Sequence, residues 1–99
     1  MKIVAVTACP TGVAHTYMAA EQLETTAKKC GHTIKVETQG AMGIENELTP
    51  ADIAKADIVI LATDIAIEKA SRFSGVKKVE IPVQRVLKDA KALLDQIKS

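Results

Sequence analysis

Residues 3–15 read IVAVTACPTGVAH, and the order of residue types in this stretch decides the fold. Its first part, Ile3-Val4-Ala5-Val6, is a continuous apolar run rich in β-branched residues, which is typical of a strand covered on both faces in a parallel sheet. A turn with a proline and a glycine follows, and a helical pattern then runs from about Ala14 to Lys29. The chain therefore opens with a central strand, a short connection and a helix.

Three further stretches predict strands. Residues 58–62, IVILA, repeat the continuous apolar pattern and indicate a second central strand. Residues 34–38, IKVET, and 79–81, VEI, alternate between apolar and polar residues. This alternation predicts outer strands, with Lys35 and Glu37 on a solvent-facing side.

Helical patterns fill the intervals between the strands. The buried side of the first helix is expected to consist of Tyr17, Ala20, Leu23 and Ala27. The sequence Thr49-Pro50-Ala51-Asp52 has the N-cap, the first-position proline and the acidic residue that start a short helix. A weaker helix is expected from about Ile67 to Arg72, and an amphipathic C-terminal helix begins near Val83.

The resulting order is β-α-β-α-β-α-β-α, which calls for parallel strands joined by right-handed crossovers. We therefore predict an α/β fold: a three-layer, Rossmann-like open sheet of four parallel strands in the order 2-1-3-4, with helices on both faces. Such a sheet has a topological switch point between strands 1 and 3, where ligands bind at the carboxyl ends of the strands. Cys9 falls there, directly after strand 1, and Asp64 follows strand 3 across the same crevice.

Length and charge exclude several classes of protein. The chain has 99 residues, which predicts one domain over residues 1–99. Its net charge is +1 and it has no Trp, which argues against nucleic-acid binding. Apolar runs stay below the roughly 18–20 residues of a membrane span, and the N-terminus does not resemble a signal peptide. The chain is expected to be cytoplasmic, with no direct insertion into a membrane.

The two cysteines are expected to be free thiols. A helix between Cys9 and Cys30 would separate them by some 20 Å, far beyond the ~7 Å limit for a disulfide. Cys30 is interpreted as structural, because the negative end of a helix works against thiolate formation. The spacing of the His and Cys residues offers no metal site, and no cofactor is expected.

The loop after strand 1 has the composition of an anion site. A helix start exposes about four unpaired N–H groups and roughly half a positive charge, which binds an anion and favours a thiolate. Phosphoryl transfer through a cysteinyl-phosphate needs both properties. We predict Cys9 as the catalytic nucleophile. The predicted phosphate-binding residues are Pro10, Thr11, Gly12, Val13, Ala14, His15 and Thr16.

Each of these interpretations has a plainer alternative. A cysteine just after a buried strand is often only a small apolar residue, so Cys9 could also be inert. Residues 38–46 contain Gln39, Gly40 and Met42, which suit either a mobile loop that contacts the site or a partner, or an ordinary long turn. Asp64 would repel a bound phosphoryl group, so it is expected at most to position the loop.

The segment CPTGVAHTYMAAE, residues 9–21, resembles the active-site segment of the IIB component of the fructose-type bacterial sugar phosphotransferase system. Three later segments also match that family: 36–40 (VETQG), 48–60 (LTPADIAKADIVI) and 72–75 (RFSG). One departure is Ser71, where the family commonly has Asp, so the sugar stays open between fructose and a related one.

The resemblance implies that Cys9 accepts a phosphoryl group from a phosphohistidine of the IIA component. It further implies that Cys9 passes this group to a sugar bound by the membrane-embedded IIC component during uptake. The chain would then be cytoplasmic and peripherally associated with the membrane transporter, either as a separate subunit or as a domain of a larger protein.

The alternative function is that of a low-molecular-weight phosphatase-like cysteine hydrolase, which also has a phosphate loop between a strand and a helix. Those enzymes have the pattern C-x5-R, whereas here His15 stands six residues after Cys9. The guanidinium that would grip a phosphate with two hydrogen bonds is therefore missing from that position. A thiol-based redox module would need a resolving cysteine nearby, and Cys30 is too distant in sequence.

Overall fold

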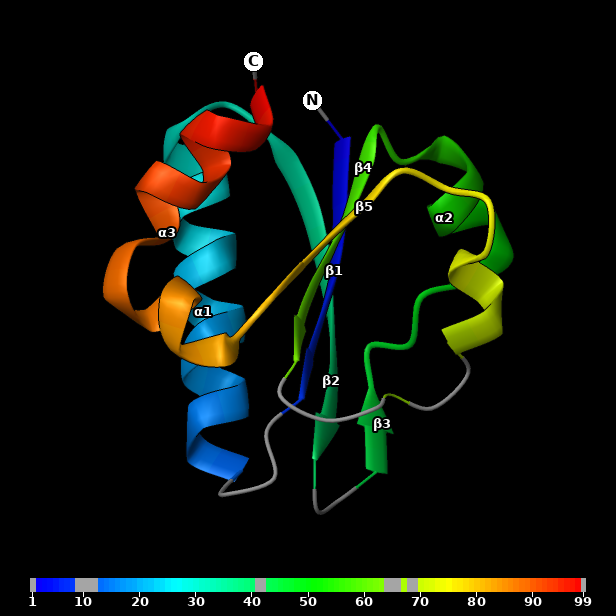
Figure 1. The fold of residues 1–99 in the computed structure, drawn as a ribbon, viewed down its shortest axis with the longest axis horizontal. Helices are drawn as coiled ribbons and strands as arrows, with labels where there is room; N and C mark the ends of the chain where they lie inside the picture. The colour runs from blue at the N-terminus through cyan, green and yellow to red at the C-terminus, as the bar shows by residue number, and fades with distance from the viewer. Residues whose placement is uncertain (1, 9–12, 41–42, 64–66, 68–69, 99) are drawn as a thin grey trace.

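A computed structural model describes residues 2–8, 13–40, 43–63, 67 and 70–98. Its centre is a sheet of five strands in the order β3-β2-β1-β4-β5 (Figure 1). The strands are β1 (Lys2–Ala8), β2 (Thr33–Gly40), β3 (Gly43–Glu45), β4 (Ile58–Thr63) and β5 (Lys78–Ile81). β1 pairs in parallel with both β2 and β4, and β4 pairs in parallel with β5.

The expectation of a four-stranded, all-parallel sheet is wrong in one respect. The short strand β3 pairs antiparallel with the end of β2, so the sheet is mixed and β2 is not an edge strand. Residues expected to form a loop or long turn thus include a tight hairpin, in which Gly40 lies opposite Gly43. Gly43 has φ +93°, a left-handed conformation that favours glycine.

Helices cover both faces of the sheet (Figure 1). The long helices α1 (Val13–Lys29) and α3 (Val83–Lys98) lie together on one face. The other face carries α2 (Pro50–Lys55) and a short 3-10 helix, η1 (Ala70–Phe73). The sequence predicts the weaker helix from about Ile67 to Arg72; Ile67 is not helical, residues 68 and 69 lie outside the described part of the chain, and η1 covers Ala70–Phe73.

Two buried apolar clusters hold these layers together. Ile3 and Ala5 of β1 face the α1 and α3 side, whereas Val4 and Val6 face the α2 and η1 side. Both alternating sets are at most 1 % exposed, as a strand buried on two faces requires. Ala20, Leu23 and Ala27 of α1 belong to the first cluster as predicted.

Tyr17 does not join that core, in contrast to the prediction. Its side chain is 37 % exposed, and its hydroxyl donates a hydrogen bond to a carboxylate oxygen of Glu45 in β3. A tyrosine whose ring is partly exposed to solvent and whose hydroxyl is hydrogen-bonded is common at protein surfaces. The contact joins the early part of α1 to the edge strand.

The start of α2 is built as its sequence predicts. Thr49 is the N-cap: its hydroxyl accepts from the Asp52 N–H at 3.1 Å, and the Asp52 carboxylate accepts from the Thr49 N–H at 3.0 Å. This reciprocal pair satisfies two backbone donors that a helix start would otherwise leave unpaired. Pro50 occupies the first turn, where a missing N–H costs little.

The prediction that Glu37 faces solvent is wrong. Glu37 is fully buried, whereas Lys35, on the same face of β2, has a side chain that is 42 % exposed and pairs with Asp52 at 2.7 Å. Alternation of apolar and polar residues indicates one buried and one exposed face. In the structure, the segment leading into α2 covers the second face, where Leu48 and Ile53 lie in the core.

Candidate active site

The candidate site lies at the carboxyl edge of the central strands, which is the lower edge of the sheet in Figure 1. β1 ends at Ala8, whose register partners are Gln39 in β2 and Thr63 in β4. β1 lies between β2 and β4 in the sheet. The chain reaches β2 through α1 on one face and β4 through α2 on the other face, so the sheet has its switch point at the end of β1. Cys9 follows Ala8 directly in the sequence.

Several of the predicted site residues lie outside the described part of the chain. These are Cys9, Pro10, Thr11, Gly12, Met42 and Asp64. Their neighbours in sequence are described: β1 ends at Ala8, α1 begins at Val13, and β4 ends at Thr63. In the sequence, Cys9 therefore follows a described strand, β1, and precedes a described helix, α1, and its own position stays a prediction.

Val13, Ala14 and His15 form the first turn of α1, a helix of 17 residues. This turn contains no acidic residue. The backbone N–H groups at the start of such a helix have no partners within the helix, and no carboxylate of this turn offsets the helix dipole. The beginning of α1 thus has the electrostatic character that an anion requires.

Thr16 connects this turn to β1. It is fully buried, and its backbone carbonyl accepts a hydrogen bond from the Thr7 hydroxyl at 3.1 Å. Its own hydroxyl is also buried and has no hydrogen-bond partner among the described residues. An unpaired buried hydroxyl costs free energy, so it marks a polar position in the early part of α1, on a residue that is bonded to Thr7 of β1.

Gln39 and Gly40 lie at the end of β2, next to the end of β1. The amide nitrogen of Gln39 donates to Glu37 Oε2 at 2.8 Å, so the side chain is tied to its own strand. Gly40 is the last residue of β2 and pairs with Gly43 of β3. Both residues therefore lie at the carboxyl edge of the sheet, next to the end of β1, and their contact with the site stays a prediction.

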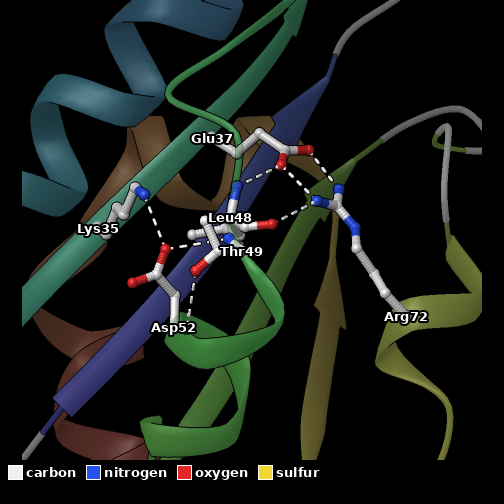
Figure 2. Close-up of polar contacts among 6 residues, drawn as sticks. All are labelled: Lys35, Glu37, Leu48, Thr49, Asp52 and Arg72. Atoms are coloured by element: carbon white, nitrogen blue, oxygen red, sulfur yellow. Dashed lines mark hydrogen bonds and ion pairs between the residues drawn. The ribbon is translucent and has the colours of Figure 1, made fainter.

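Glu37, which is fully buried, and Arg72, whose side chain is 15% exposed, form an ion pair that sequence reasoning missed (Figure 2). Arg72 Nη2 donates to Glu37 Oε2 at 2.5 Å and Nη1 donates to Oε1 at 2.7 Å. Leu48 supplies two further contacts: its N–H donates to Glu37 Oε1 at 2.9 Å, and its carbonyl accepts from Arg72 Nη1 at 3.2 Å. The two charged residues are 35 positions apart in the sequence, so no local sequence pattern predicts their contact.

Hydrogen bonding overcomes burial at Glu37. Burial alone would raise the pKa of this carboxyl group, since it removes the charged form from water. Donors from Arg72, Gln39 and the Leu48 N–H act in the opposite direction, and the net effect lowers the pKa of Glu37 below its ordinary value. Glu37 is therefore ionised at neutral pH, as the paired guanidinium requires.

A second ion pair lies on the same face, further from the carboxyl edge (Figure 2). The Lys35 ammonium group and the capping hydrogen bonds with Thr49 hold the pKa of Asp52 well below its usual range.

Among the described residues, no group of three His, Cys, Asp or Glu side chains could hold a metal ion. Cys30 is a free, half-buried thiol.

Comparison with known proteins shows the family of the chain. Over residues 4–96 the sequence matches the family described as "PTS system, Lactose/Cellobiose specific IIB subunit". The chain belongs to the PTS IIB family. Within the described residues, no helix of this IIB domain has both the length and the apolar character needed to cross a membrane.

Relatives assign the IIB domain to the fructose type, as its sequence resemblance predicted. It is 54% identical over 98 residues to the "PTS system fructose-like EIIB component 2" of Escherichia coli (strain K12), covering 99% of this chain and 92% of that protein. It also resembles the solved Enzyme IIB subunit of the PTS system from Escherichia coli K12. That comparison has a TM-score of 0.93 and 43% identity, and it covers 98% of this chain and 90% of the other.

A longer relative contains the same domain. The IIB chain is 52% identical over 99 residues to the "Fructose-like PTS system EIIBC component" of Escherichia coli (strain K12). The match covers 98% of this chain but only 20% of that protein. In that relative, therefore, a IIB domain and an EIIC part belong to one polypeptide, and IIB domains of the PTS are phosphotransferases in general.

Proposed function

We propose that residues 1–99 form a IIB domain that carries a phosphoryl group on Cys9. In the first step the Cys9 thiolate attacks the phosphorus of a phosphohistidine on the IIA component. The S–P bond forms as the N–P bond breaks, and the electron pair of the broken bond returns to the imidazole ring. In the second step a hydroxyl of the sugar bound by IIC attacks the phosphorus. The thiolate leaves, and the hydroxyl proton is released to solvent.

One observation carries this proposal: β1 ends at Ala8 in the middle of the sheet, and the 17-residue helix α1 begins at Val13. The sulfur therefore belongs to the connection between a central strand and the positive end of a long helix. That environment lowers the pKa of a thiol and stabilises negative charge on a bound phosphoryl group. Nucleophile activation and anion binding then come from the same few backbone N–H groups.

The remaining site residues divide by the chemistry they offer. We assign the backbone of residues 11–16 to phosphate binding, whereas Pro10 has no N–H and restricts the start of the segment. The hydroxyl of Thr16 is buried and unpaired among the described residues, which supports a role as a donor within this segment. His15 would act as a further donor to the phosphoryl oxygens. Gln39, Gly40, Met42 and Asp64 would border the site and contact partners.

The proposed partners are IIA as the phosphoryl donor and membrane-embedded IIC as the carrier of the sugar acceptor. The EIIBC relative, in which the two parts share one polypeptide, supports the second partnership. A domain that acts between such partners works at the cytoplasmic face of the membrane, without inserting into it. The acceptor is proposed to be fructose or a related sugar, in keeping with the names of the relatives.

The decisive experiment measures covalent phosphorylation by intact-protein mass spectrometry. The protein is incubated with phosphorylated IIA, first as the natural sequence and then as Cys9→Ser and Cys30→Ser. We expect the natural protein and Cys30→Ser to gain one phosphoryl group and Cys9→Ser to gain none. Cys30→Ser is the matched control, because it removes the other thiol of the chain.

Two results would reject the proposal. The first is a phosphoryl group that survives in Cys9→Ser, which would assign the carrier atom to another residue. The second is rapid release of inorganic phosphate from p-nitrophenyl phosphate by the natural protein, in a reaction that Cys9→Ser abolishes. That outcome would instead support a low-molecular-weight phosphatase-like hydrolase.

A further inference from the structure

The Glu37–Arg72 ion pair spans the central strand of the sheet. Glu37 is on β2, Arg72 is in η1 beyond β4, and β1 lies between β2 and β4. The register shows where the crossing occurs, because Val6 of β1 is the partner of both Glu37 and Leu61. The pair therefore lies over β1 only two residues before Ala8, where the strand ends.

The same network continues toward the carboxyl edge. Gln39 donates to Glu37 Oε2 at 2.8 Å and is the register partner of Ala8. Leu48, the first core residue after the β3 hairpin, is held by hydrogen bonds at both its N–H and its carbonyl. The network thus ties together the end of β2, the chain after the hairpin and the chain after β4.

Stability alone does not explain why a buried ion pair occupies this position. Removing two charges from water is costly, and apolar residues of similar volume often stabilise a protein equally well or better. What an ion pair held by five hydrogen bonds supplies is geometry, because a two-point contact between planar groups defines both distance and orientation. The elements that it joins are β2, which borders β1, and η1, with Leu48 between them.

We propose that Glu37 and Arg72 are positioning residues for phosphoryl transfer. By joining β2 to η1 across β1, they hold the surroundings of Cys9 in the geometry that keeps its thiolate and accepts the phosphoryl group. Neither residue touches the reacting atoms. This inference rests on the proposed function, because it assigns the pair to the same reaction.

The test separates positioning from stability with the double variant Glu37→Gln/Arg72→Met in a Cys30→Ser background. The double variant removes both buried charges, so no charge is left unpaired, and Gln retains an acceptor for the Leu48 N–H. Circular dichroism and cooperative unfolding establish that it folds. Two quantities are then measured: the single-turnover rate of phosphorylation at saturating phosphorylated IIA, and the pH midpoint of Cys9 alkylation by iodoacetamide.

We expect the folded double variant to lose about 10- to 100-fold in phosphorylation rate, the scale on which small misplacements act in enzymes. Its alkylation midpoint should move upward, toward about 8.5 for an unperturbed thiol. Arg72→Lys keeps a charge beside Glu37 but loses the two-point contact, so it should show smaller losses in the same direction. It replaces the double variant in both assays if the latter does not fold.

The matched control is Lys35→Met, which breaks the other ion pair of β2, further from the carboxyl edge. It should leave both the rate and the midpoint unchanged. The proposal is overturned if the folded double variant keeps the natural rate, if its midpoint does not move, or if Lys35→Met lowers the rate to the same extent. Alkylation does not depend on IIA, so it still tests the pair if Cys9 proves not to carry the phosphoryl group.

Discussion

Arg72 holds both carboxylate oxygens of Glu37, at 2.7 Å from Nη1 to Oε1 and 2.5 Å from Nη2 to Oε2. Each oxygen accepts one more hydrogen bond, from the Leu48 N–H and from Gln39 Nε2. With four donors, the buried carboxylate has the hydrogen bonds that water would otherwise supply. The arrangement makes the pair tolerant of burial but sensitive to the loss of either member.

Breaking the pair from one side should therefore be much worse than removing it. Arg72→Met leaves the Glu37 charge buried and unpaired, which we expect to lower the free energy of unfolding by about 3 kcal/mol. In Glu37→Gln/Arg72→Met no charge is left, so most of this loss should be regained. Urea unfolding monitored by circular dichroism measures both values.

The comparison contradicts this account if the double variant is less stable than Arg72→Met. Such a result would mean that the Glu37 carboxylate stabilises the fold independently of Arg72, for example through Leu48 and Gln39 alone. Lys35→Met serves as a reference for a more exposed ion pair, because the side chains of Lys35 and Asp52 are 42% and 28% exposed. Exposed pairs contribute only about 0–1 kcal/mol.

The stability of the domain should depend on pH through Glu37. Its pKa is lower in the folded protein than its ordinary value of 4.5, so at acidic pH the unfolded chain binds the proton more readily. The stabilisation is fully present above about pH 4.5 and is lost as the pH falls through the folded-state pKa. The pKa of Asp52 is also lowered, but its effect on the pH dependence of stability should be the same in the natural protein and in a variant of Glu37.

Urea midpoints measured from pH 6 downward would test this dependence. The natural protein should lose stability more steeply below about pH 4.5 than Glu37→Gln/Arg72→Met, because the variant has no carboxyl group at this position. Parallel curves for the two proteins would show that Glu37 does not titrate differently in the folded and unfolded states. Asp52→Asn removes the other shifted carboxyl and tests whether the two contributions add.

The central part of the fold was predictable because burial on two faces leaves a strong signal in the sequence. β1 and β4 are continuous apolar runs, and in the structure both are buried on both faces. The α2 start was equally clear, because a threonine cap, a proline and an acidic residue act locally. In these cases the sequence signal and the physical cause lie within a few residues of each other.

The errors arise where the cause lies far along the chain. Glu37 alternates with apolar neighbours, and alternation alone does not reveal that Leu48 and Arg72 cover its face. The β3 hairpin pairs Gly40 with Gly43, and such glycines also suit a flexible loop. At the site, the start of α1 and the end of β1 were predicted from local residues, whereas the ion pair that joins β2 to η1 could be found only from the structure.

Leu23 and Met18 on α1 differ in burial, so truncating them to alanine should change the stability by very different amounts. Leu23 is fully buried between α1 and the sheet, so Leu23→Ala should cost about 2–5 kcal/mol through lost burial and a remaining cavity. Met18 is 51% exposed on the same helix, and Met18→Ala should change stability by no more than about 0.5 kcal/mol. Thermal and urea unfolding of the two variants measure the contrast, and equal losses would refute the assignment of the buried face of α1.

The chain has a single tyrosine, so the contact between Tyr17 and Glu45 can be followed without interference. The hydrogen bond to Glu45 is the main reason that the pKa of Tyr17 is raised above its ordinary value of 10.0, with burial and the Glu45 charge acting in the same direction. Ultraviolet titration of tyrosinate should therefore give a midpoint above 10 in the natural protein. In Glu45→Gln the charge is gone, and the midpoint should fall toward 10.

Glu24→Gln is the control for this titration, because it removes an acid on α1 two turns beyond Tyr17 and should leave the midpoint where it is in the natural protein. Equal midpoints in the natural protein and Glu45→Gln would mean that the two side chains do not meet in solution. A real contact would show that the edge strand β3 is held against α1 beside the start of that helix. The hairpin that borders the candidate site would then be fixed on one side by Tyr17 and on the other by Leu48, through Glu37 and Arg72.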